Sequence, residues 1–242
     1  MTRPVETVMV TGASRGIGLE LVRQSLERGR RVIAASRQSS PELDEVGAAH
    51  TDHFVPLRMD PGNEDSIIDA RNSLDGHVDV LHLLINNAGI YSKWSANWNA
   101  EATQFDTVTR DELMDVYRIN AVGPMLVIQH FLNLLRHSRR GRILNLSSLL
   151  GSVSVRTSPG DYAYSASKAA LNIMTRALAA ELAPDGIVAI AITPGWVRTE
   201  MGGHAAPLTP RESARGILDV AGRLTPRDAG RFVDYQGKEQ PW

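Results

Sequence analysis

The stretch Thr11-Gly12-Ala13-Ser14-Arg15-Gly16-Ile17-Gly18 follows a short apolar run, Glu6–Val10, and leads at once into an amphipathic run. Glycines at these positions let the backbone turn tightly and come close to a pyrophosphate, whose charge would lie at the N-terminus of the following helix. Gly16 and Gly18 could instead simply allow a helix to pack closely on a strand. Because a strand pattern precedes the turn and a helix pattern follows it, we favour a nucleotide-binding turn, with the spacing GxxxGxG rather than GxGxxG.

The rest of the chain continues this alternation of strand and helix patterns. The short apolar, β-branched runs that predict strands are Glu6–Val10, Arg31–Ser36, His53–Met59, Val80–Asn86, Gly141–Ser147, Ile187–Thr193 and Phe232–Tyr235. The amphipathic runs that predict helices are Ile17–Arg28, Asn63–Ser73, Arg110–Leu135, Asp161–Leu182 and Pro210–Gly222. Strands such as HLLIN (82–86) are apolar on both faces, which is typical of a parallel sheet covered by helices on both sides. We therefore expect one domain over residues 1–242, an α/β, Rossmann-type, doubly wound fold with a mostly parallel sheet of about seven strands.

Composition excludes several classes of function. The 26 basic and 27 acidic residues give a formal net charge of −1, so no overall field would attract nucleic acid or an anionic membrane. The sequence has no cysteine and no metal-ligand spacing such as HExxH among its histidines, so we expect no disulfide, thiolate catalysis or metal site. No signal-peptide pattern opens the sequence, and no stretch approaches the roughly 18 apolar residues of a membrane span. We expect a cytoplasmic protein.

The end of the second predicted strand bears on which nucleotide binds. NAD enzymes usually place an acid there to bind the ribose hydroxyls, whereas this sequence has Ser36 followed by Arg37, with Arg15 in the glycine turn. Two guanidinium groups and a hydroxyl suit the 2′-phosphate of NADP through charge-assisted hydrogen bonds. Arg37 could also lie in solvent without a ligand. We expect NADP(H) as the cofactor.

The helix pattern Asp161–Leu182 contains Tyr164-Ser165-Ala166-Ser167-Lys168, which brings a phenol and an ammonium together, because residues four apart share one helix face. A free tyrosine has a pKa near about 10, and a nearby ammonium together with the positive nicotinamide ring would move it toward a useful acid–base range. Tyr162 lacks such a partner, since its i+4 neighbour is Ala166. Taken alone, Tyr-x-x-x-Lys is common and usually structural.

Further polar groups fall at the ends of predicted strands or inside a helix pattern. Asn86-Asn87-Ala88-Gly89 closes the fourth strand, where a plain turn is the alternative. Ser147 and Ser148 close the fifth strand, and from the residues alone either hydroxyl could face a site at the carboxyl edge of the sheet. Asn120 lies within a helical pattern, an unfavourable position for asparagine unless its amide has a specific task or bends the helix.

Together these motifs resemble those of the short-chain dehydrogenase/reductase family. The matching features are TGASRGIG at 11–18, NNAG at 86–89, the mid-helix Asn120, the set Ser148–Tyr164–Lys168 and PGWVRT at 194–199. They occur in the family's order and cover nearly the whole chain. With its longer interval between Ser148 and Tyr164 and the endings PGWVRTEMGG and DYQGKEQPW, the sequence looks most like the C-factor- or sniffer-like carbonyl reductases.

The resemblance implies a role for each candidate catalytic residue. Tyr164 would give a proton to a carbonyl oxygen or take one from a secondary alcohol, and Lys168 would depress the pKa of Tyr164 and bind the nicotinamide ribose. Ser148, chosen over Ser147 on this resemblance, would hydrogen-bond the substrate oxygen, and Asn120 would hold a water that links Lys168 to solvent. The implied enzyme is an NADP(H)-dependent oxidoreductase that transfers a hydride between the nicotinamide and a carbonyl carbon.

The resemblance also implies the cofactor contacts. Asp60, after the third strand, would touch the adenine unless it serves only as a helix N-cap. The residues expected at the phosphates and the adenosine are Gly12, Ser14, Arg15, Gly16, Ile17, Gly18, Ser36, Arg37, Asn87, Ala88 and Gly89. Those expected at the nicotinamide are Pro194, Gly195, Val197 and Thr199, together with Tyr164 and Lys168.

Aromatic residues in irregular segments suggest an apolar substrate pocket. The candidates are Tyr91, Trp94, Trp98, Trp196 and the loop Ser152–Gly160, although Trp94 and Trp98 could merely pin down their own loop. Arg156 and Arg198 are the only obvious cations for an anionic substrate. We expect a small or medium apolar ketone or aldehyde, or the corresponding alcohol.

Ala163, Ala166 and Ala170 would permit close helix–helix contact between the long predicted helices of two copies. The resemblance to the family implies a homodimer or homotetramer, with a monomer as the alternative among carbonyl-reductase-like members. The alternative function is a catalytically idle protein that binds NADP(H) for sensing or signalling. An intact Ser148–Tyr164–Lys168 set argues against it, since a sensor has no use for a poised phenol. Epimerase or dehydratase chemistry would need a larger C-terminal substrate region than the segment after Thr199.

Overall fold

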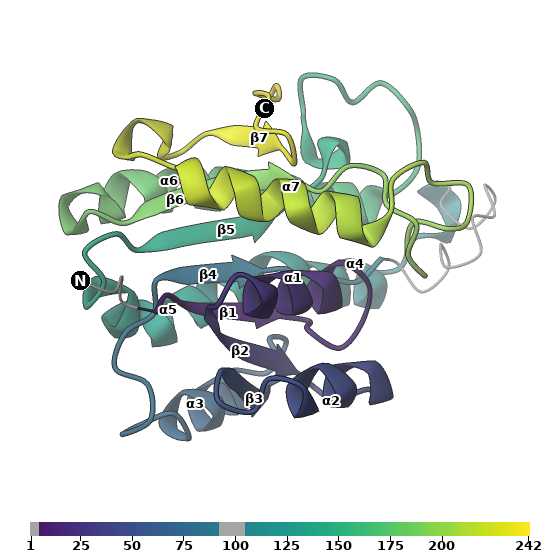
Figure 1. The fold of residues 1–242 in the computed structure, drawn as a ribbon. Coiled ribbons are helices and arrows are strands. Elements are labelled where there is room, and N and C mark those ends of the chain that lie inside the picture. The colour runs from purple at the N-terminus through teal and green to yellow at the C-terminus, as the bar shows by residue number, and fades with distance from the viewer. Residues whose placement is uncertain (1–4, 92–104) are drawn as a thin grey trace.

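The computed structural model describes residues 5–91 and 105–242, which form a parallel sheet between two layers of helices (Figure 1). The strands are β1 (Thr7–Thr11), β2 (Arg31–Ser36), β3 (Phe54–Arg58), β4 (Leu83–Asn86), β5 (Arg142–Leu146), β6 (Val188–Thr193) and β7 (Phe232–Asp234). They lie in the order β3-β2-β1-β4-β5-β6-β7, and every neighbouring pair is parallel. The order reverses between β1 and β4, as in a Rossmann-type doubly wound sheet. The fold class predicted from the sequence is confirmed.

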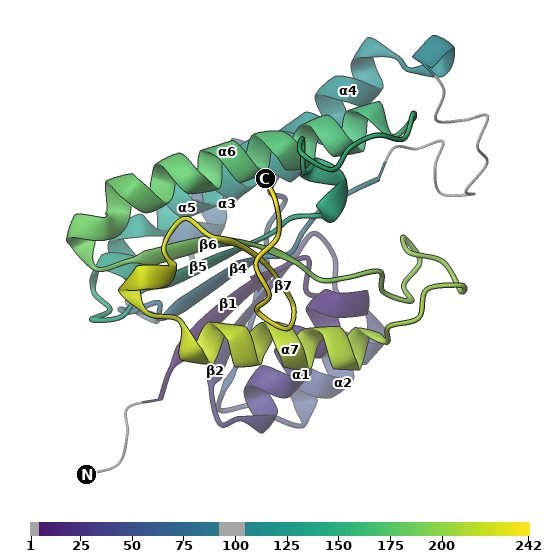
Figure 2. The ribbon, with the colours of Figure 1, turned by 90° about the horizontal axis from the view of Figure 1, so that it is seen from above.

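Helices cover both faces of the sheet because each connection between parallel strands must cross one face. They are α1 (Gly16–Glu27), α2 (Pro41–Ala48), α3 (Glu64–Asn72), α4 (Arg110–Tyr117), α5 (Gly123–Arg136), α6 (Tyr162–Leu182) and α7 (Pro210–Arg223). Figure 2 shows α1, α2 and α7 on one side of the sheet and α3, α4, α5 and α6 on the other. Within the described parts of the chain, none of these helices is both long and apolar enough to cross a membrane.

Each strand overlaps a predicted run, but the helices differ from the prediction in two places. The sequence patterns miss α2, although its start carries recognisable signals: Ser40 accepts a hydrogen bond from the Leu43 amide, and Pro41 lies in the first turn. The run Arg110–Leu135, predicted as one helix, is divided into α4 and α5 by a π-helical turn at Arg118–Val122. Such turns often occur at functional sites, and this one contains Asn120.

Two separate layers of apolar side chains hold the helices to the sheet. One face of the sheet packs against α1 and α7 through residues such as Leu21 and Ile217. The other face packs against α3 and α5 through residues such as Ile67 and Phe131. All four side chains are inaccessible to solvent. Since both faces are buried, functional groups are confined to the edges of the sheet where the strands begin and end.

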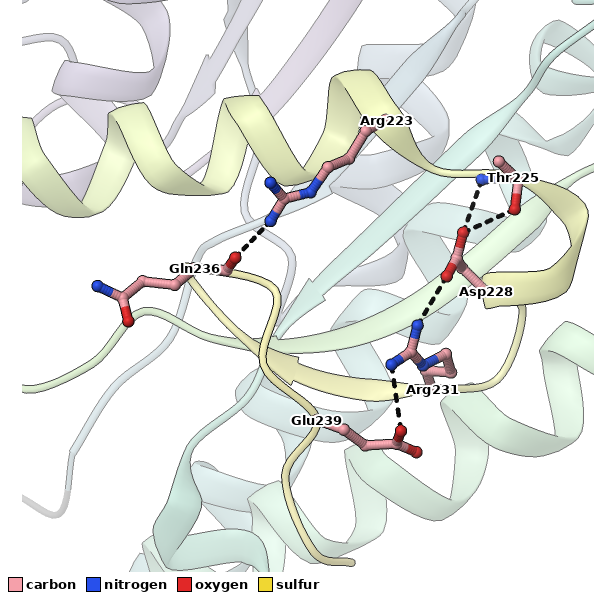
Figure 3. Close-up of polar contacts among 6 residues, drawn as sticks. All are labelled: Arg223, Thr225, Asp228, Arg231, Gln236 and Glu239. Carbon is pink, nitrogen blue, oxygen red and sulfur yellow. Dashed lines mark hydrogen bonds and ion pairs between the residues drawn. The ribbon is translucent and has the colours of Figure 1, made fainter.

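The segment after β7 turns back and is fastened by polar contacts (Figure 3). Arg231 donates hydrogen bonds to Asp228 at 2.8 Å and to Glu239 at 3.1 Å. Arg223, the last residue of α7, donates to the carbonyl of Gln236. A cavity of about 150 Å³ lies among these groups, between α7 and β7 and away from the carboxyl edge of the sheet.

Trp242 joins this C-terminal segment to the loop Ser152–Gly160. Its ring packs on Phe232 with the ring centroids 5.5 Å apart, and Arg176 from α6 lies 5.4 Å from its ring centroid. The carbonyl of Trp242 accepts a hydrogen bond from the Ser154 amide at 2.8 Å. The loop that precedes α6 is therefore supported from the far end of the chain.

At the amino edge of the sheet, Glu6 is shared between two arginines. Its carboxylate lies 2.7 Å from Arg142 Nη2 and 3.3 Å from Arg30 Nε. Burial tends to raise the pKa of Glu6, but the attraction of Arg142 and Arg30 outweighs it and holds the pKa below its ordinary value. The side chains of Arg142 and Arg30 are only 9% and 12% exposed, so removing the carboxylate would leave two poorly solvated cations.

Glu6→Gln is expected to lower the free energy of unfolding at pH 7 by about 1–2 kcal/mol. This is less than the roughly 3–5 kcal/mol cost of breaking a fully buried pair, because the Glu6 side chain is 37% exposed and water screens its charge. The folded-state pKa is depressed, so this stabilisation is present above the unfolded value of about 4.3 and fades as the pH falls through the folded value. Urea unfolding of both proteins at pH 7 and about pH 3.5 measures the effect. An equal difference at the two pH values would contradict it.

Candidate active site

The loops that follow β1, β4, β5 and β6 meet at the carboxyl edge of the sheet, where the strand order reverses. In open parallel sheets this edge forms the crevice in which ligands bind. Each loop carries one of the sequence motifs, which are the glycine turn 11–18, the NNAG segment 86–89, the serine pair 147–148 and the segment 194–199. The fold therefore gathers motifs that are far apart in sequence at one edge.

The glycine turn has the backbone geometry of a loop that approaches a phosphate closely. Gly12 and Gly16 adopt φ angles of +67° and +57°, a conformation that other residues rarely adopt. A Cβ on Gly18 would lie 2.1 Å from the carbonyl oxygen of Gly12, so α1 can begin this close to the turn only with glycine there. Arg15 occupies the N-cap of α1 without a side-chain cap, which leaves the first amides of the helix to bind an anion.

Thr11 and Asn87 tie the glycine turn to the loop after β4. The Thr11 hydroxyl accepts hydrogen bonds from the amides of Asn87 at 3.1 Å and Ala88 at 3.0 Å. The Asn87 side chain donates to the carbonyls of Thr11 at 2.8 Å and Gly12 at 3.1 Å. Sequence reasoning expected a cofactor contact for Asn87 and missed Thr11. A hydroxyl residue that ends a strand directly before the glycines is the signal that could have identified it.

The end of β2 lies beside the same turn. The Ser40 hydroxyl, at the start of α2, donates a hydrogen bond to the carbonyl of Ser14 at 2.7 Å. Between these elements, Ser36 is buried and Arg37 is exposed. The two residues expected at a 2′-phosphate are thus next to the glycine turn, with the guanidinium in solvent.

Asp60 forms part of the turn that follows β3. Its carboxylate accepts a hydrogen bond from the Gly62 amide at 2.9 Å, and its own amide donates to the Ser66 hydroxyl at 3.0 Å. The N-cap of α3 is Asn63, whose side chain accepts from the Ser66 amide at 3.2 Å. The alternative expectation that Asp60 serves as the N-cap is therefore wrong, because the chain makes one more turn before the helix begins.

The loop after β6 packs over the glycine turn. Thr199 lies so close to Gly16 that a Cβ there would be 3.3 Å from the Thr199 methyl carbon. Glu200 forms an ion pair with Arg15 at 2.9 Å, and Val197 is buried beneath the loop. The two charged side chains are 78% and 75% exposed, so their pair contributes only about 0–1 kcal/mol and can give way to another anion.

The first residues of the same loop are fixed to the C-terminal part of the fold. The carbonyl of Pro194 accepts a hydrogen bond from the Ser213 hydroxyl of α7 at 2.8 Å. Gly195 lies against Leu208 and the ring of Tyr235. The segment expected at the nicotinamide therefore rests on α7 and on the chain after β7.

Tyr164 and Lys168 lie one turn apart on α6, beside the end of β5. Ser148 forms a side-chain hydrogen bond with Tyr164 and accepts another from the Leu150 amide at 3.1 Å. Lys168 donates a hydrogen bond to the carbonyl of Leu146, the last residue of β5, at 2.7 Å. Tyr164 is 9% and Lys168 5% exposed. The phenol and the ammonium are thus buried, and the half-buried Ser148 hydroxyl lies beside the phenol.

The two adjacent serines have different surroundings. Ser147 is buried, and its hydroxyl donates to the Asn172 side chain at 2.6 Å, whereas Ser148 lies at Tyr164. Asn172 in turn donates to the carbonyl of Gly151 at 3.2 Å and so fixes the turn that follows Ser148. Sequence reasoning missed Asn172, although an asparagine inside a helix pattern is the same signal that singled out Asn120.

Burial dominates the protonation of this cluster. It raises the pKa of Tyr164 to about 12, while the hydrogen bond with Ser148 lowers it and the charge of Asp161 raises it. Burial lowers the pKa of Lys168 to about 8. The expectation that Lys168, together with a bound nicotinamide, depresses the pKa of Tyr164 stays a prediction. In the structure Lys168 Nζ is 5.7 Å from the centre of the Tyr164 ring and donates its hydrogen bond to Leu146.

Asn120 is fully buried in the π-helical turn between α4 and α5. Its Oδ1 accepts a hydrogen bond from the Ile90 amide and its Nδ2 donates to the Ile90 carbonyl, both at 2.8 Å. Nδ2 also donates to the Ser167 hydroxyl at 3.1 Å. The expected role of holding a water beside Lys168 stays a prediction. The side chain itself fixes the loop after β4 against α6, where Gly89 passes close to the lysine.

The expected substrate pocket is described in part. Tyr91 stacks on the Tyr164 ring with the ring centroids 4.5 Å apart. Trp196 is 49% exposed in the loop after β6, and the loop before α6 exposes two valines. Trp94 and Trp98 lie outside the described residues. Of these aromatic candidates, Tyr91 is therefore the one that the structure shows in contact with the phenol.

Both candidate cations for an anionic substrate already have partners. Arg156 donates to the carbonyl of Gly160 and lies 4.0 Å from the Asp161 carboxylate. Arg198 Nε donates to the carbonyl of Ala206 at 3.2 Å.

Comparison with known proteins agrees with this arrangement. Residues 6–207 match the family model of short chain dehydrogenases. The chain is 41% identical over 173 residues to the C-signal of Myxococcus xanthus, an alignment that covers 72% of this chain and 98% of that protein. It superposes on the NADPH-bound carbonyl reductase from chicken fatty liver with a TM-score of 0.87 and 32% identity, covering 98% of this chain and 99% of the other.

A second solved structure gives the same result. The carbonyl reductase Sniffer of D. melanogaster superposes with a TM-score of 0.89 and 30% identity, covering 98% of this chain and 100% of the other. The family expected from the sequence motifs is therefore confirmed. The chain belongs to the short-chain dehydrogenase/reductase family of oxidoreductases, and within that family it is similar to the carbonyl reductases.

Proposed function

We propose that the chain is an NADP(H)-dependent oxidoreductase that transfers a hydride between the nicotinamide and a carbonyl or secondary alcohol, with Tyr164 as the acid–base group. The observation that carries the proposal is the cluster of buried Tyr164 and Lys168 with half-buried Ser148, at the same edge of the sheet as the glycine turn. Similarity to the NADPH-bound carbonyl reductase from chicken fatty liver supports the choice of cofactor. One domain would carry both the cofactor site and the reacting groups.

The residues around the glycine turn fit a dinucleotide phosphate. The uncapped N-terminus of α1 would hold the pyrophosphate, and Ser36, Arg37 and Arg15 would hold the 2′-phosphate. Lys168 would bind the nicotinamide ribose, and Asp60 would lie at the adenine. When bound, the nicotinamide supplies or accepts the hydride.

The protein's own groups would manage the proton. Tyr164 is protonated at neutral pH because burial raises its pKa to about 12, so it can donate a proton to a carbonyl oxygen during reduction. Ser148 would donate a hydrogen bond to the same oxygen. Lys168 has a pKa of about 8 and is charged at pH 7, so its ammonium would stabilise the phenolate that remains. A proton taken up from solvent would then restore the phenol and complete the cycle.

The substrate that fits best is an uncharged, small or medium apolar ketone or aldehyde, or the corresponding alcohol. Tyr91 and Trp196 offer aromatic surface at the mouth of the site, while Arg156 and Arg198 are engaged by other groups. Screening NADPH consumption against a diverse carbonyl library tests this assignment.

A second candidate function follows from the 41% identity to the C-signal of Myxococcus xanthus, a protein named as a signal. In this alternative the chain binds NADP(H) without turnover. Tight binding of NADPH together with no consumption across the whole carbonyl library would favour it. The intact cluster around Tyr164 favours the enzyme.

We also propose that the protein forms a homodimer or homotetramer through α6. Ile173 is 65% exposed on this helix, and Ala166 is exposed two turns before it on the same face. Ala163, which the sequence analysis assigned to this face, is instead buried. Light scattering after size-exclusion chromatography measures the assembly.

Tyr164→Phe is expected to lower kcat for carbonyl reduction by about 10²–10⁴-fold, because the substrate oxygen loses its proton donor. NADPH affinity should stay nearly unchanged. Tyr162→Phe is the matched control, since Tyr162 is exposed and its ring contacts Phe105 rather than the cluster. Steady-state kinetics and NADPH fluorescence titration measure both quantities. Full activity of Tyr164→Phe would remove the assignment.

Arg37→Asp is expected to weaken NADPH binding by about 10- to 100-fold, because a charge-assisted hydrogen bond to the 2′-phosphate is replaced by repulsion. NADH lacks that phosphate and should bind the variant about as well as the wild type. Calorimetric titration with the two nucleotides compares them. An equal loss of affinity for both would refute the role of Arg37.

A further inference from the structure

Asp161 has a backbone conformation that needs an explanation. Its φ is +52°, and among the residues that the structure describes it is the only non-glycine residue with positive φ. Such a conformation costs free energy and often marks a functional position. Asp161 also stands at the N-cap of α6, where an aspartate usually caps the helix, yet its side chain makes no capping hydrogen bond.

The Asp161 carboxylate instead contacts Tyr91 and Arg156, which come from two loops at the mouth of the site. It accepts a hydrogen bond from the hydroxyl of Tyr91, which lies in the loop after β4, and it is 4.0 Å from Arg156. The side chains of Asp161 and Arg156 are 23% and 20% exposed, so water screens this interaction only in part. Arg156 also donates to the carbonyl of Gly160, which anchors the loop before α6.

Tyr91 carries the influence of Asp161 to the reacting phenol. Its ring lies 4.5 Å from the Tyr164 ring, centroid to centroid, at an interplanar angle of 37°. The hydrogen bond to Asp161 fixes the far end of this ring, so Tyr91 holds the Tyr164 ring in place. Burial and the acceptor Asp161 raise the pKa of Tyr91 above its ordinary value, so Tyr91 remains a neutral donor to the carboxylate.

We infer that Asp161 is a positioning residue for the proposed reaction, which fixes the phenol of Tyr164 through Tyr91 and biases the site toward carbonyl reduction. This inference rests on the proposed function. In reduction, the carbonyl carbon would gain the hydride released when a C–H bond of NADPH breaks to give NADP⁺. The C=O π pair would move to oxygen, and that oxygen would take the proton of Tyr164 and leave a phenolate. Oxidation of an alcohol requires the deprotonated phenolate, which a neighbouring negative charge disfavours.

The charged and titratable groups around Tyr164 come from three elements. Lys168 lies on α6 and Asp161 at its N-cap, Tyr91 lies in the loop after β4, and Arg156 lies in the loop before α6. Asp161 raises the pKa of Tyr164. Removing its charge should therefore favour the phenolate, whereas removing the neighbouring charge of Arg156 should leave the carboxylate less screened and favour the phenol.

The test is Asp161→Asn, which keeps an oxygen acceptor for Tyr91 and removes the charge. Asparagine tolerates positive φ better than most residues, so the fold should be retained. At a fixed pH of about 8, the ratio of kcat for alcohol oxidation to kcat for carbonyl reduction should rise about three- to tenfold, as expected for a charge removed at this range in a partly screened site. The KM values of the alcohol and the carbonyl compound should change in compensation, because the equilibrium constant is fixed. The pH at which oxidation reaches half its maximum should fall in parallel. NADPH affinity should not change.

One further variant tests the direction of the effect, and another serves as the control. Arg156→Gln should change the ratio of oxidation to reduction in the opposite direction. Asp219→Asn removes an exposed carboxylate of α7 that pairs with Arg28, and it should leave the ratio unchanged. If Asp161→Asn slows both directions by the same factor, or leaves the ratio at the wild-type value, the inference is overturned. Activity in Tyr164→Phe would instead overturn the proposed function, so the two failures are distinguishable.

Discussion

The buried ammonium of Lys168, which donates to the carbonyl of Leu146 at the end of β5, is the interaction on which the site depends. A charge in this position costs free energy, as the lowering of its pKa to about 8 indicates. The close approach of neighbouring backbone makes the burial possible. A Cβ on Gly151 would lie 2.7 Å from Lys168, and one on Gly89 would lie 3.6 Å from its Nζ. The loop after β5 therefore needs glycine at 151 to admit the lysine, and the loop after β4 passes in ordinary contact with it.

Charged groups have different roles at the two edges of the sheet. At the amino edge, Glu6 is paired with two arginines, and the interaction stabilises the fold. At the carboxyl edge, Lys168 donates to a carbonyl rather than to a carboxylate. Asp161, whose charge acts on Tyr164, accepts a hydrogen bond from Tyr91. Neither the Lys168 ammonium nor the Tyr164 phenol is therefore held in an ion pair with a carboxylate. Both can still take part in proton transfer, as the groups of a reacting site must.

Much of the fold could be predicted because apolar strands that are buried on both faces leave a strong pattern, and β2 matches its predicted run residue for residue. The short helix α2 was missed because its eight residues offer little periodicity. The π-helical turn at Asn120 leaves the apolar pattern of the surrounding helix intact, so periodicity cannot detect it. The pairing of Tyr164 with Lys168 follows from their spacing. The protonation of both groups does not, because it depends on burial and on where Nζ donates its hydrogen bond.

The most direct test of this account is the pKa of Lys168 itself. The sequence contains three lysines, Lys93, Lys168 and Lys238, so protein labelled with ¹³C-lysine gives few ε-carbon signals, and Lys168→Met assigns the one of interest. An NMR pH titration is predicted to show Lys168 titrating near a pKa of about 8. Titration of all three lysines near the ordinary value of about 10.4 would show that the ammonium is solvated, and it would contradict the account.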